Sequence, residues 1–300
     1  MRHAFVTLMS IVLAAGPEST TASPPPVPEA RAPRFLDPAQ PVVAMARPPL
    51  RIVSLAPVAT ETLAALGVFG RVVGVTRFCD TPAEALLLPK VGGFTDPSLE
   101  RIVALEPDLV VALPSLGQRQ LLERLASRGI PVFVGFTDTV SEVRSFVTTL
   151  GRVLKVESRA RTVVSALDDA LKRAPRTTCA PRVLVVVGSD PLVAAGPGTF
   201  PMEAVLMLGG TSAVPSGGPL WPTLSLEALA TLKPDVIVVA EGPAATASVR
   251  AAVARLWAAA PPIKAADRAI LMRPGPGLAN DIGVLAGLLQ EPDVCPAGAP

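Results

Sequence analysis

Few side chains in this sequence could carry out covalent chemistry. The 300 residues include one histidine, His3, three cysteines and no tyrosine. Without a histidine in the body of the chain, neither a Ser-His-Asp triad nor a Cys-His nucleophile can be assembled, and no Gly-x-Ser-x-Gly elbow is present. The enzyme alternative that remains is a pair of carboxylates in a cleft, such as Asp80 and Asp190. We therefore expect a binding protein with no catalytic residues.

The three cysteines do not have the spacing of a metal site, so no metal ligands are predicted. Cys179 and Cys295 both fall in the second half of the chain and are candidates for a disulfide. Cys295 lies in a Pro/Gly-rich tail whose path cannot be derived from the sequence, so the pair stays open. Cys79 is expected to be a buried free thiol.

Two glutamates stand at equivalent places in a repeated segment. Residues 98–112, SLERIVALEPDLVVA, return as residues 225–239, SLEALATLKPDVIVV, at a constant offset of 127. Each copy predicts a short helix capped by a serine, a Pro-Asp break and a buried strand. Glu100 and Glu227 then lie exposed in the first helical turn, near the positive end of the helix dipole. Their repetition also indicates two negative contact points, one in each half of the chain.

Composition is consistent with two similar halves and excludes one class of function. Half of the residues are hydrophobic, and 300 residues is a prior of about two domains. The net charge of +2 provides no basic stripe of the kind that nucleic-acid binding requires. With two tryptophans and nine phenylalanines, a large aromatic in a loop becomes a candidate contact residue.

The N-terminal segment predicts export. Arg2 and His3 precede an apolar stretch from Ala4 to Ala15, which is too short to span a bilayer and is typical of a secretory signal, residues 1–16. An apolar N-terminal strand is the alternative. No cysteine is placed there to accept a lipid, so a mature chain without an anchor is expected. Residues 17–50 are rich in proline and alanine and predict an extended, unpacked linker.

The rest of the chain alternates strands and helices, which predicts parallel sheets covered by helices. The expected N-terminal lobe, 51–138, has strands 51–55, 72–75, 109–112 and 131–136, with helices near 60–66, 98–105 and 118–128. Residues 139–175 predict one long linking helix, because no proline occurs from 141 to 172 and apolar residues recur with helical spacing. A break of this helix at Gly151 is an option. The expected C-terminal lobe, 176–290, has strands 182–187, 236–239 and 269–272, a glycine-rich loop 188–199, and helices near 202–208, 225–232, 244–259 and 278–289. A tail, 291–300, follows.

Several of these segments together resemble periplasmic substrate-binding proteins of vitamin B12, haem and siderophore importers, and cobalamin-binding proteins most. The resemblance is carried by RIVSLAP at 51–57, Thr60-Glu61, Ala65-Leu66-Gly67, Gly74-Val75, Cys79-Asp80-Thr81-Pro82, Val91-Gly92-Gly93 and the clause at 98–112. It implies an α/β fold of two Rossmann-like lobes joined by a single long helix, and a ligand cleft between the lobes. It also implies an ABC permease with its ATPase as partner, and a monomeric carrier located in the periplasm.

The resemblance further implies that a flat corrinoid is held by apolar and aromatic contacts. Phe78, Phe94 and Trp221 match aromatic positions of the family, whereas Leu113 and Leu192 replace aromatics that relatives carry. Glu100 and Glu227 match the glutamates that engage permease arginines. The expected ligand-binding residues are Val58, Phe78, Phe94, Leu113, Asp190, Leu192, Trp221 and Arg273. Cobalamin or a related corrinoid is the expected ligand, and no other cofactor is expected.

The same fold accommodates two other ligands in the family. Family members that bind haem ligate its iron through tyrosine or histidine, and loss of His3 with the signal would leave neither. Anionic ferric siderophores favour a basic pocket, which Arg77 and Arg273 could provide. A siderophore is therefore the alternative ligand.

Overall fold

The computed structural model describes residues 45, 47–115, 118–257, 259–266 and 271–295, together with the backbone of residues 35–36 and 279–280. The predicted signal peptide, most of the predicted linker and residues 296–300 lie outside this set. No helix in these described ranges is long and apolar enough to cross a membrane.

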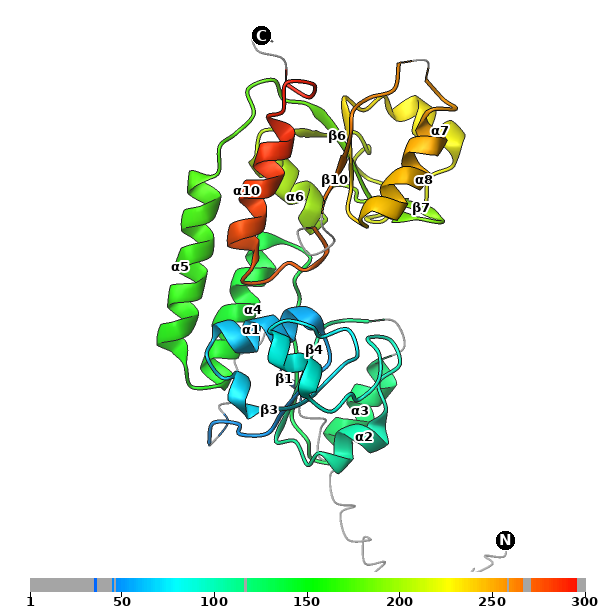
Figure 1. Cartoon of the computed structure of the whole chain (residues 1–300). Coiled ribbons are helices and arrows are strands. Elements are labelled where there is room, and N and C mark those ends of the chain that lie inside the picture. Colours follow the sequence, from blue (N-terminus) through cyan, green and yellow to red (C-terminus); the bar gives the residue numbers. More distant parts are fainter. Residues whose placement is uncertain are drawn as a thin grey trace, which may run out of the picture. The chain divides into compact units, whose positions relative to one another are not determined.

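The N-terminal lobe is built on a five-stranded sheet in which all neighbours are parallel (Figure 1). The strand order is β1-β5-β4-β2-β3. Its inner strands are short apolar runs buried on both faces, as expected for a sheet covered by helices. The strands are β1 (Phe35–Leu36), β2 (Ile52–Ser54), β3 (Val72–Val75), β4 (Leu109–Ala112) and β5 (Val132–Val134).

Strand β1 corrects the prediction that residues 17–50 form an unpacked linker. Phe35 and Leu36 pair with Val132 and Phe133 at the edge of the sheet, and Met45 packs against the core. The edge of β5 offers unpaired backbone groups, which a two-residue segment can satisfy whatever its composition.

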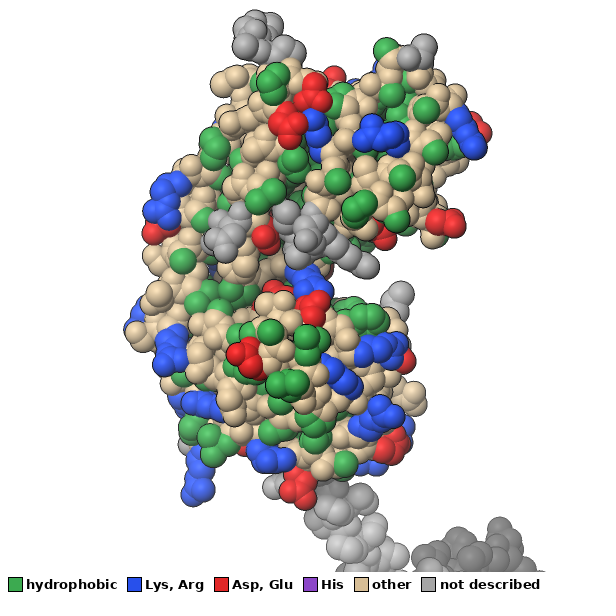
Figure 2. All heavy atoms as spheres, viewed as in Figure 1, with side chains coloured by type: hydrophobic (Ala, Val, Ile, Leu, Met, Phe, Trp, Pro, Cys, Tyr) green, Lys and Arg blue, Asp and Glu red, His purple; other side chains and the backbone are tan. Residues whose placement is uncertain are grey.

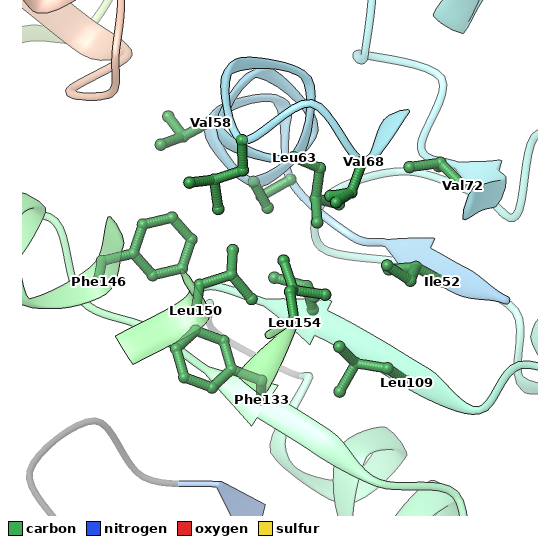
Figure 3. Packing of buried hydrophobic residues seen from close by; sticks show 14 of the residues in the cluster. Ile52, Val58, Leu63, Val68, Val72, Leu109, Phe133, Phe146, Leu150 and Leu154 are labelled. Carbon is green, nitrogen blue, oxygen red and sulfur yellow. The ribbon is translucent and has the colours of Figure 1, made fainter. Parts of the chain in front are cut away.

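The helices of this lobe are α1 (Pro57–Ala65), η1 (Phe69–Arg71), η2 (Ala83–Leu87), α2 (Leu99–Ala104) and α3 (Arg119–Ser127). Helix α1 and the later helix α4 (Val140–Val153) cover one face of the sheet. Figure 3 shows Leu63, Leu150 and Leu154 converging on the strands there. Phe133 of β5 stacks on Phe146 of α4, with ring centroids 5.7 Å apart. All of these side chains are fully buried, so the core fixes α4 against the N-terminal sheet.

The prediction of one long helix over residues 139–175 is wrong. The segment forms two antiparallel helices, α4 (Val140–Val153) and α5 (Glu157–Arg173). Lys155 adopts a positive φ of 59° and turns the chain. Gly151 does not break the helix: a Cβ there would lie 2.4 Å from the Cβ of Ala160, so glycine permits close packing of α4 on α5. Because α5 also contacts α10, it connects the lobes (Figure 1).

The C-terminal lobe has a second five-stranded sheet, with β10-β9-β6-β7 in order and β8 paired to the start of β6. All pairs are parallel except β6 with β7. The strands are β6 (Arg182–Ser189), β7 (Leu192–Ala194), β8 (Thr211–Ser212), β9 (Val236–Val239) and β10 (Ile263–Ala265). Helices α6 (Phe200–Met207) and α10 (Leu278–Leu289) pack on one face, and α7 (Leu226–Leu232) and α8 (Pro243–Val253) on the other.

Two predictions for this lobe are corrected. The glycine-rich segment 188–199 is not wholly a loop, because β7 forms a hairpin with β6 inside it. The strand predicted at 269–272 is instead β10 at Ile263–Ala265, and residues 271–272 are helical. Residues 269–270 lie outside the described residues.

Two of the cysteines are paired and the third is free. Cys179 and Cys295 form a disulfide with their Cα atoms 5.6 Å apart, which resolves the pairing that the sequence left open. Cys79 is a buried free thiol, as predicted.

Candidate functional site

A cavity of about 580 Å³ lies between the two lobes, within the size range of ligand sites. In Figure 2 the surface is hollowed between the lobes. The N-terminal lobe lines the cavity with Ala56, Pro57, Val58, Phe78, Phe94, Thr95, Leu113, Pro114, Thr137 and Asp138. The C-terminal lobe lines it with Phe200, Pro201, Trp221, Leu271, Met272, Arg273 and Pro274.

The fold explains why these residues meet. In a parallel sheet, the loops after the carboxyl ends of the strands share one edge. Val58 follows β2, Phe78 follows β3, Leu113 follows β4, and Asp138 follows β5. Four loops that are far apart in the sequence therefore form one wall.

The rings of Phe78 and Trp221 are available to contact a ligand and are not buried in a core. Phe78 is 49% exposed and Trp221 is 40% exposed, although both line the cavity. The guanidinium carbon of Arg77 lies 5.0 Å from the Phe78 ring centroid and supports the ring through a cation-π contact. Phe94 is half-buried against the N-terminal core, and Gln118 donates a hydrogen bond to its carbonyl. All three aromatic predictions converge on the same cavity.

Trp221 is held by the backbone on both sides. The amide of Gly196 donates a hydrogen bond to the carbonyl of Leu220 over 2.8 Å. The amide of Ala194 donates one to the carbonyl of Pro222 over 3.0 Å. Strand β7 thus fixes the loop that carries the indole, a support that the sequence did not indicate.

Arg273 lines the cavity but is occupied by carboxylates of the opposite lobe. Its Nη1 and Nη2 donate to the two carboxylate oxygens of Asp80 over 2.7 and 3.1 Å, and Nη1 lies 3.4 Å from Oε1 of Glu61. The hydrogen bonds from Arg273 lower the pKa of Asp80. Burial raises the pKa of Glu61 despite the attraction of Arg273. The pair ties the lobes together beside the cavity.

Two further contacts join the lobes behind the cavity. A buried cluster brings together Val140, Val143, Leu167, Phe200 and Leu278. The carboxylate of Glu203 on α6 accepts a hydrogen bond from the amide of Val140 at the start of α4, over 2.7 Å. Asp138, just before this point, has a raised pKa because of burial and the nearby charge of Glu142.

Asp190 and Leu192 do not line the cavity, unlike the other six residues predicted to bind ligand. The β6–β7 hairpin explains both positions. It places Asp190 at the exposed turn, while Leu192 packs against the core on one face of the C-terminal sheet. Neither Asp80 nor Asp190 lines the cavity, so the carboxylate pair considered for an enzyme is not assembled there.

Sequence reasoning missed several lining residues, among them Thr137, Asp138, Phe200 and Pro201. Thr137 and Asp138 follow the predicted strand 131–136, so the rule for parallel sheets could have found them. Phe200 and Pro201 open helix α6; their place in the cavity depends on the contact between lobes, for which the sequence carries no local signal.

Glu100 and Glu227 occupy equivalent, exposed positions at the starts of α2 and α7. Ser98 and Ser225 cap these helices by accepting hydrogen bonds from the amides of Arg101 and Ala228. The pKa of each glutamate is lowered by a hydrogen bond from its own backbone amide and then by one from the capping serine. Both carboxylates are therefore charged and exposed to solvent.

Across the described ranges, no three His, Cys, Asp or Glu side chains are grouped so as to hold a metal ion.

Known proteins resemble this chain over most of its length. A vitamin B12-binding protein of Vibrio parahaemolyticus is 30% identical over 197 residues, which cover 64% of this chain and 72% of that protein. A periplasmic haem-binding protein from Pseudomonas aeruginosa has a solved structure that is 27% identical, with a TM-score of 0.66 over 80% of this chain and 92% of that one. The vitamin B12-binding protein BtuF of Vibrio cholerae, 24% identical, shares the fold with a TM-score of 0.64 over 81% of this chain and 99% of that chain.

The family model for periplasmic binding proteins matches residues 52–258. This range includes both sheets except for β1 and β10, and it contains the lining residues of the cavity from Ala56 to Trp221. The chain therefore belongs to the periplasmic binding protein family.

Proposed function

We propose that this chain is the periplasmic solute-binding component of an ABC importer and that it binds a corrinoid, cobalamin or a close relative, in the cavity between the lobes. The observation that carries the proposal is the convergence of Phe78, Phe94 and Trp221 on one largely apolar cavity. The faces of such rings can stack on a flat ligand and bury apolar area against it. The vitamin B12-binding relatives at 30% identity support the choice of ligand.

Capture and release need no covalent chemistry. In this proposal a leader at residues 1–16 directs the chain to the periplasm, where it acts as a monomer. The carboxylates of Glu100 and Glu227 meet arginines of the permease, which steers association and sets the register of docking.

Titration of the purified protein with cyanocobalamin, haemin and a ferric hydroxamate, followed by calorimetry, tests the ligand. Cyanocobalamin should bind, and Trp221→Ala should weaken its binding by about 1–3 kcal/mol. Trp257→Phe is the matched control, because Trp257 packs in the C-terminal core and does not line the cavity. Phe78→Ala has a similar control in Phe136→Ala, since Phe136 is comparably exposed but lies outside the lining. Unchanged affinity in Trp221→Ala and Phe78→Ala would remove the aromatic wall from the site.

Transport assays test docking separately. The double variant Glu100→Ala/Glu227→Ala should keep wild-type affinity for the ligand and slow uptake into vesicles that contain the permease. Normal uptake would refute the docking role.

The alternative of an anionic siderophore has less support from the structure than from the sequence. Arg77 is paired with Asp96 at 3.1 Å and does not line the cavity, and Arg273 is paired with Asp80. The two arginines that could have made a basic pocket are both neutralised.

A further inference from the structure

The charged groups beside the cavity are unevenly balanced. Among the described lining residues, Arg273 carries the positive charge and Asp138 the negative one. Two more carboxylates, Asp80 and Glu61, contact Arg273 from the N-terminal lobe. Two carboxyl groups of the opposite lobe thus contact one guanidinium.

The geometry commits Arg273 to Asp80. Both terminal nitrogens face the two carboxylate oxygens of Asp80, the parallel arrangement in which guanidinium and carboxylate bind most strongly. The side chains of Arg273 and Glu61 are 25% and 15% exposed, so water screens these two charges less than at an open surface, whereas the Asp80 side chain is 50% exposed. A ligand carboxylate at this edge would have to break the pair or approach it against Asp80 and Glu61.

We propose that Asp80, assisted by Glu61, is a specificity-determining residue: by occupying Arg273 it makes the cavity reject ligands with anionic groups at this edge and accept ligands with neutral amides there. This inference rests on the proposed function and names the charge class of its ligand. It operates by penalising the wrong ligand, since an unpaired or like charge costs more than a lost neutral contact.

Two ligand pairs that differ only in charge test the inference. The first is cyanocobalamin, whose rim carries neutral amides, and its mono-acids, in each of which one amide is hydrolysed to a carboxylate. The second is haemin dimethyl ester and haemin. The ratio of dissociation constants within each pair is measured by calorimetry or absorbance for the wild type, Asp80→Asn and Asp80→Asn/Glu61→Gln.

The wild type should prefer the neutral member of a pair. Asp80→Asn should reduce this preference by about fivefold, the effect of one partly exposed charge pair, and the double variant should reduce it further. Asp168→Asn is the matched control, because it frees Arg144 from a partly exposed ion pair whose two residues do not line the cavity. It should leave both ratios unchanged.

The outcomes separate the two proposals. Equal ratios in the wild type and both Asp80 variants, or an equal shift in Asp168→Asn, would overturn the role of Asp80. If cyanocobalamin fails to bind but the haemin pair shows the shift, the corrinoid assignment fails and the charge selectivity stands. Absence of binding by both pairs overturns both.

Discussion

The two lobes share one building block and differ around it. Helix α2 with strand β4 and helix α7 with strand β9 come from the two copies of the repeated clause. The likeness extends to single backbone angles: Glu106 has φ 46° and Lys233 has φ 45°, and each precedes a proline. Because a residue before proline avoids the right-handed helical region, the two helices end within one residue of the equivalent position, at Ala104 and Leu232.

The aspartate after that proline has the same task in both lobes. Asp108 accepts hydrogen bonds from the amides of Leu50 and Arg51 over 2.8 and 2.9 Å, and Asp235 accepts one from the amide of Arg182 over 2.7 Å. Asp108 thus ties its copy of the clause to the start of β2, and Asp235 ties the other copy to the start of β6. What is repeated is thus the unit that joins a helix, a turn and two strands.

The differences lie at the margins of this unit. The C-terminal lobe is closed by the disulfide between Cys179 and Cys295 and carries the antiparallel β7, whereas the N-terminal lobe keeps its Cys79 free. The comparison teaches that the repeated clause forms an equivalent part of each sheet, while the disulfide and the antiparallel strand belong to the C-terminal lobe.

The disulfide should give the largest measurable difference between the lobes. Cys179→Ser/Cys295→Ser opens a loop of 116 residues and should cost the C-terminal lobe about 4 kcal/mol of unfolding free energy. Both tryptophans, Trp221 and Trp257, lie in this lobe, so their fluorescence in a urea titration reports it. Cys79→Ala, in the N-terminal lobe, is the control and should leave that transition in place. Overlapping curves for the double variant and the wild type would show that the bridge contributes no stability.

Loss of Asp108 or Asp235 should give the next largest effect on stability. Asp108 serves two amides and Asp235 serves one, so Asp108→Ala should cost about 2 kcal/mol and Asp235→Ala about 1 kcal/mol of unfolding free energy. Urea titrations followed by circular dichroism measure both. Equal costs would mean that the second hydrogen bond of Asp108 adds nothing and that the two clamps are equivalent.

Much of this fold is predictable because the signals are local. Serine caps, the Pro-Asp break and apolar strand runs predicted the repeated unit, whereas Val58, Phe78 and Leu113 were expected at the site from the family resemblance. Strand β7 escaped prediction because it lies within a segment rich in turn residues, and β10 escaped it because Lys264 interrupts the apolar run. Their pairing with β6 and β9 is decided by distant segments.

The candidate site also has some residues that local signals predict and some contacts that depend on distant segments. The aromatic residues could be found from loop position, but the pairing of Arg273 with Asp80 joins residues 193 apart in the sequence. The turn at Lys155 was also hidden, since apolar periodicity runs on through it and no proline marks it. Contacts between lobes are where sequence reasoning stops.

The pH dependence of stability should distinguish the two N-terminal carboxylates that face Arg273. The pKa of Asp80 is lowered in the folded state, so its stabilising effect is present above the ordinary aspartate pKa of 3.8 and is lost as pH falls through the folded value. Asp80→Asn should therefore be less stable than the wild type by a few tenths of a kcal/mol at neutral pH, and the gap should close below about pH 4.

Glu61 changes the stability with pH in the opposite direction. Its pKa is raised above 4.5 by burial, so its effect favours folding at low pH and is lost as pH rises through the folded value. Glu61→Gln should gain stability relative to the wild type from acid to neutral pH. Thermal unfolding between about pH 3 and pH 7 measures both variants. Parallel pH profiles for Asp80→Asn and Glu61→Gln would contradict the assignment.

The smallest expected effect concerns the two proposed docking glutamates, which lie at equivalent positions but have different charged neighbours. Arg124 and Arg128 lie near Glu100 and lower its pKa slightly, whereas no basic side chain contributes to the shift of Glu227. Neighbouring arginines offset the negative charge that a permease would meet at Glu100. Glu227→Gln should therefore slow association with the permease about twofold more than Glu100→Gln, measured by stopped flow at low salt. The difference should shrink as salt screens both sites. If both single variants slow association equally at low salt, the arginines do not modulate docking and the two glutamates are interchangeable.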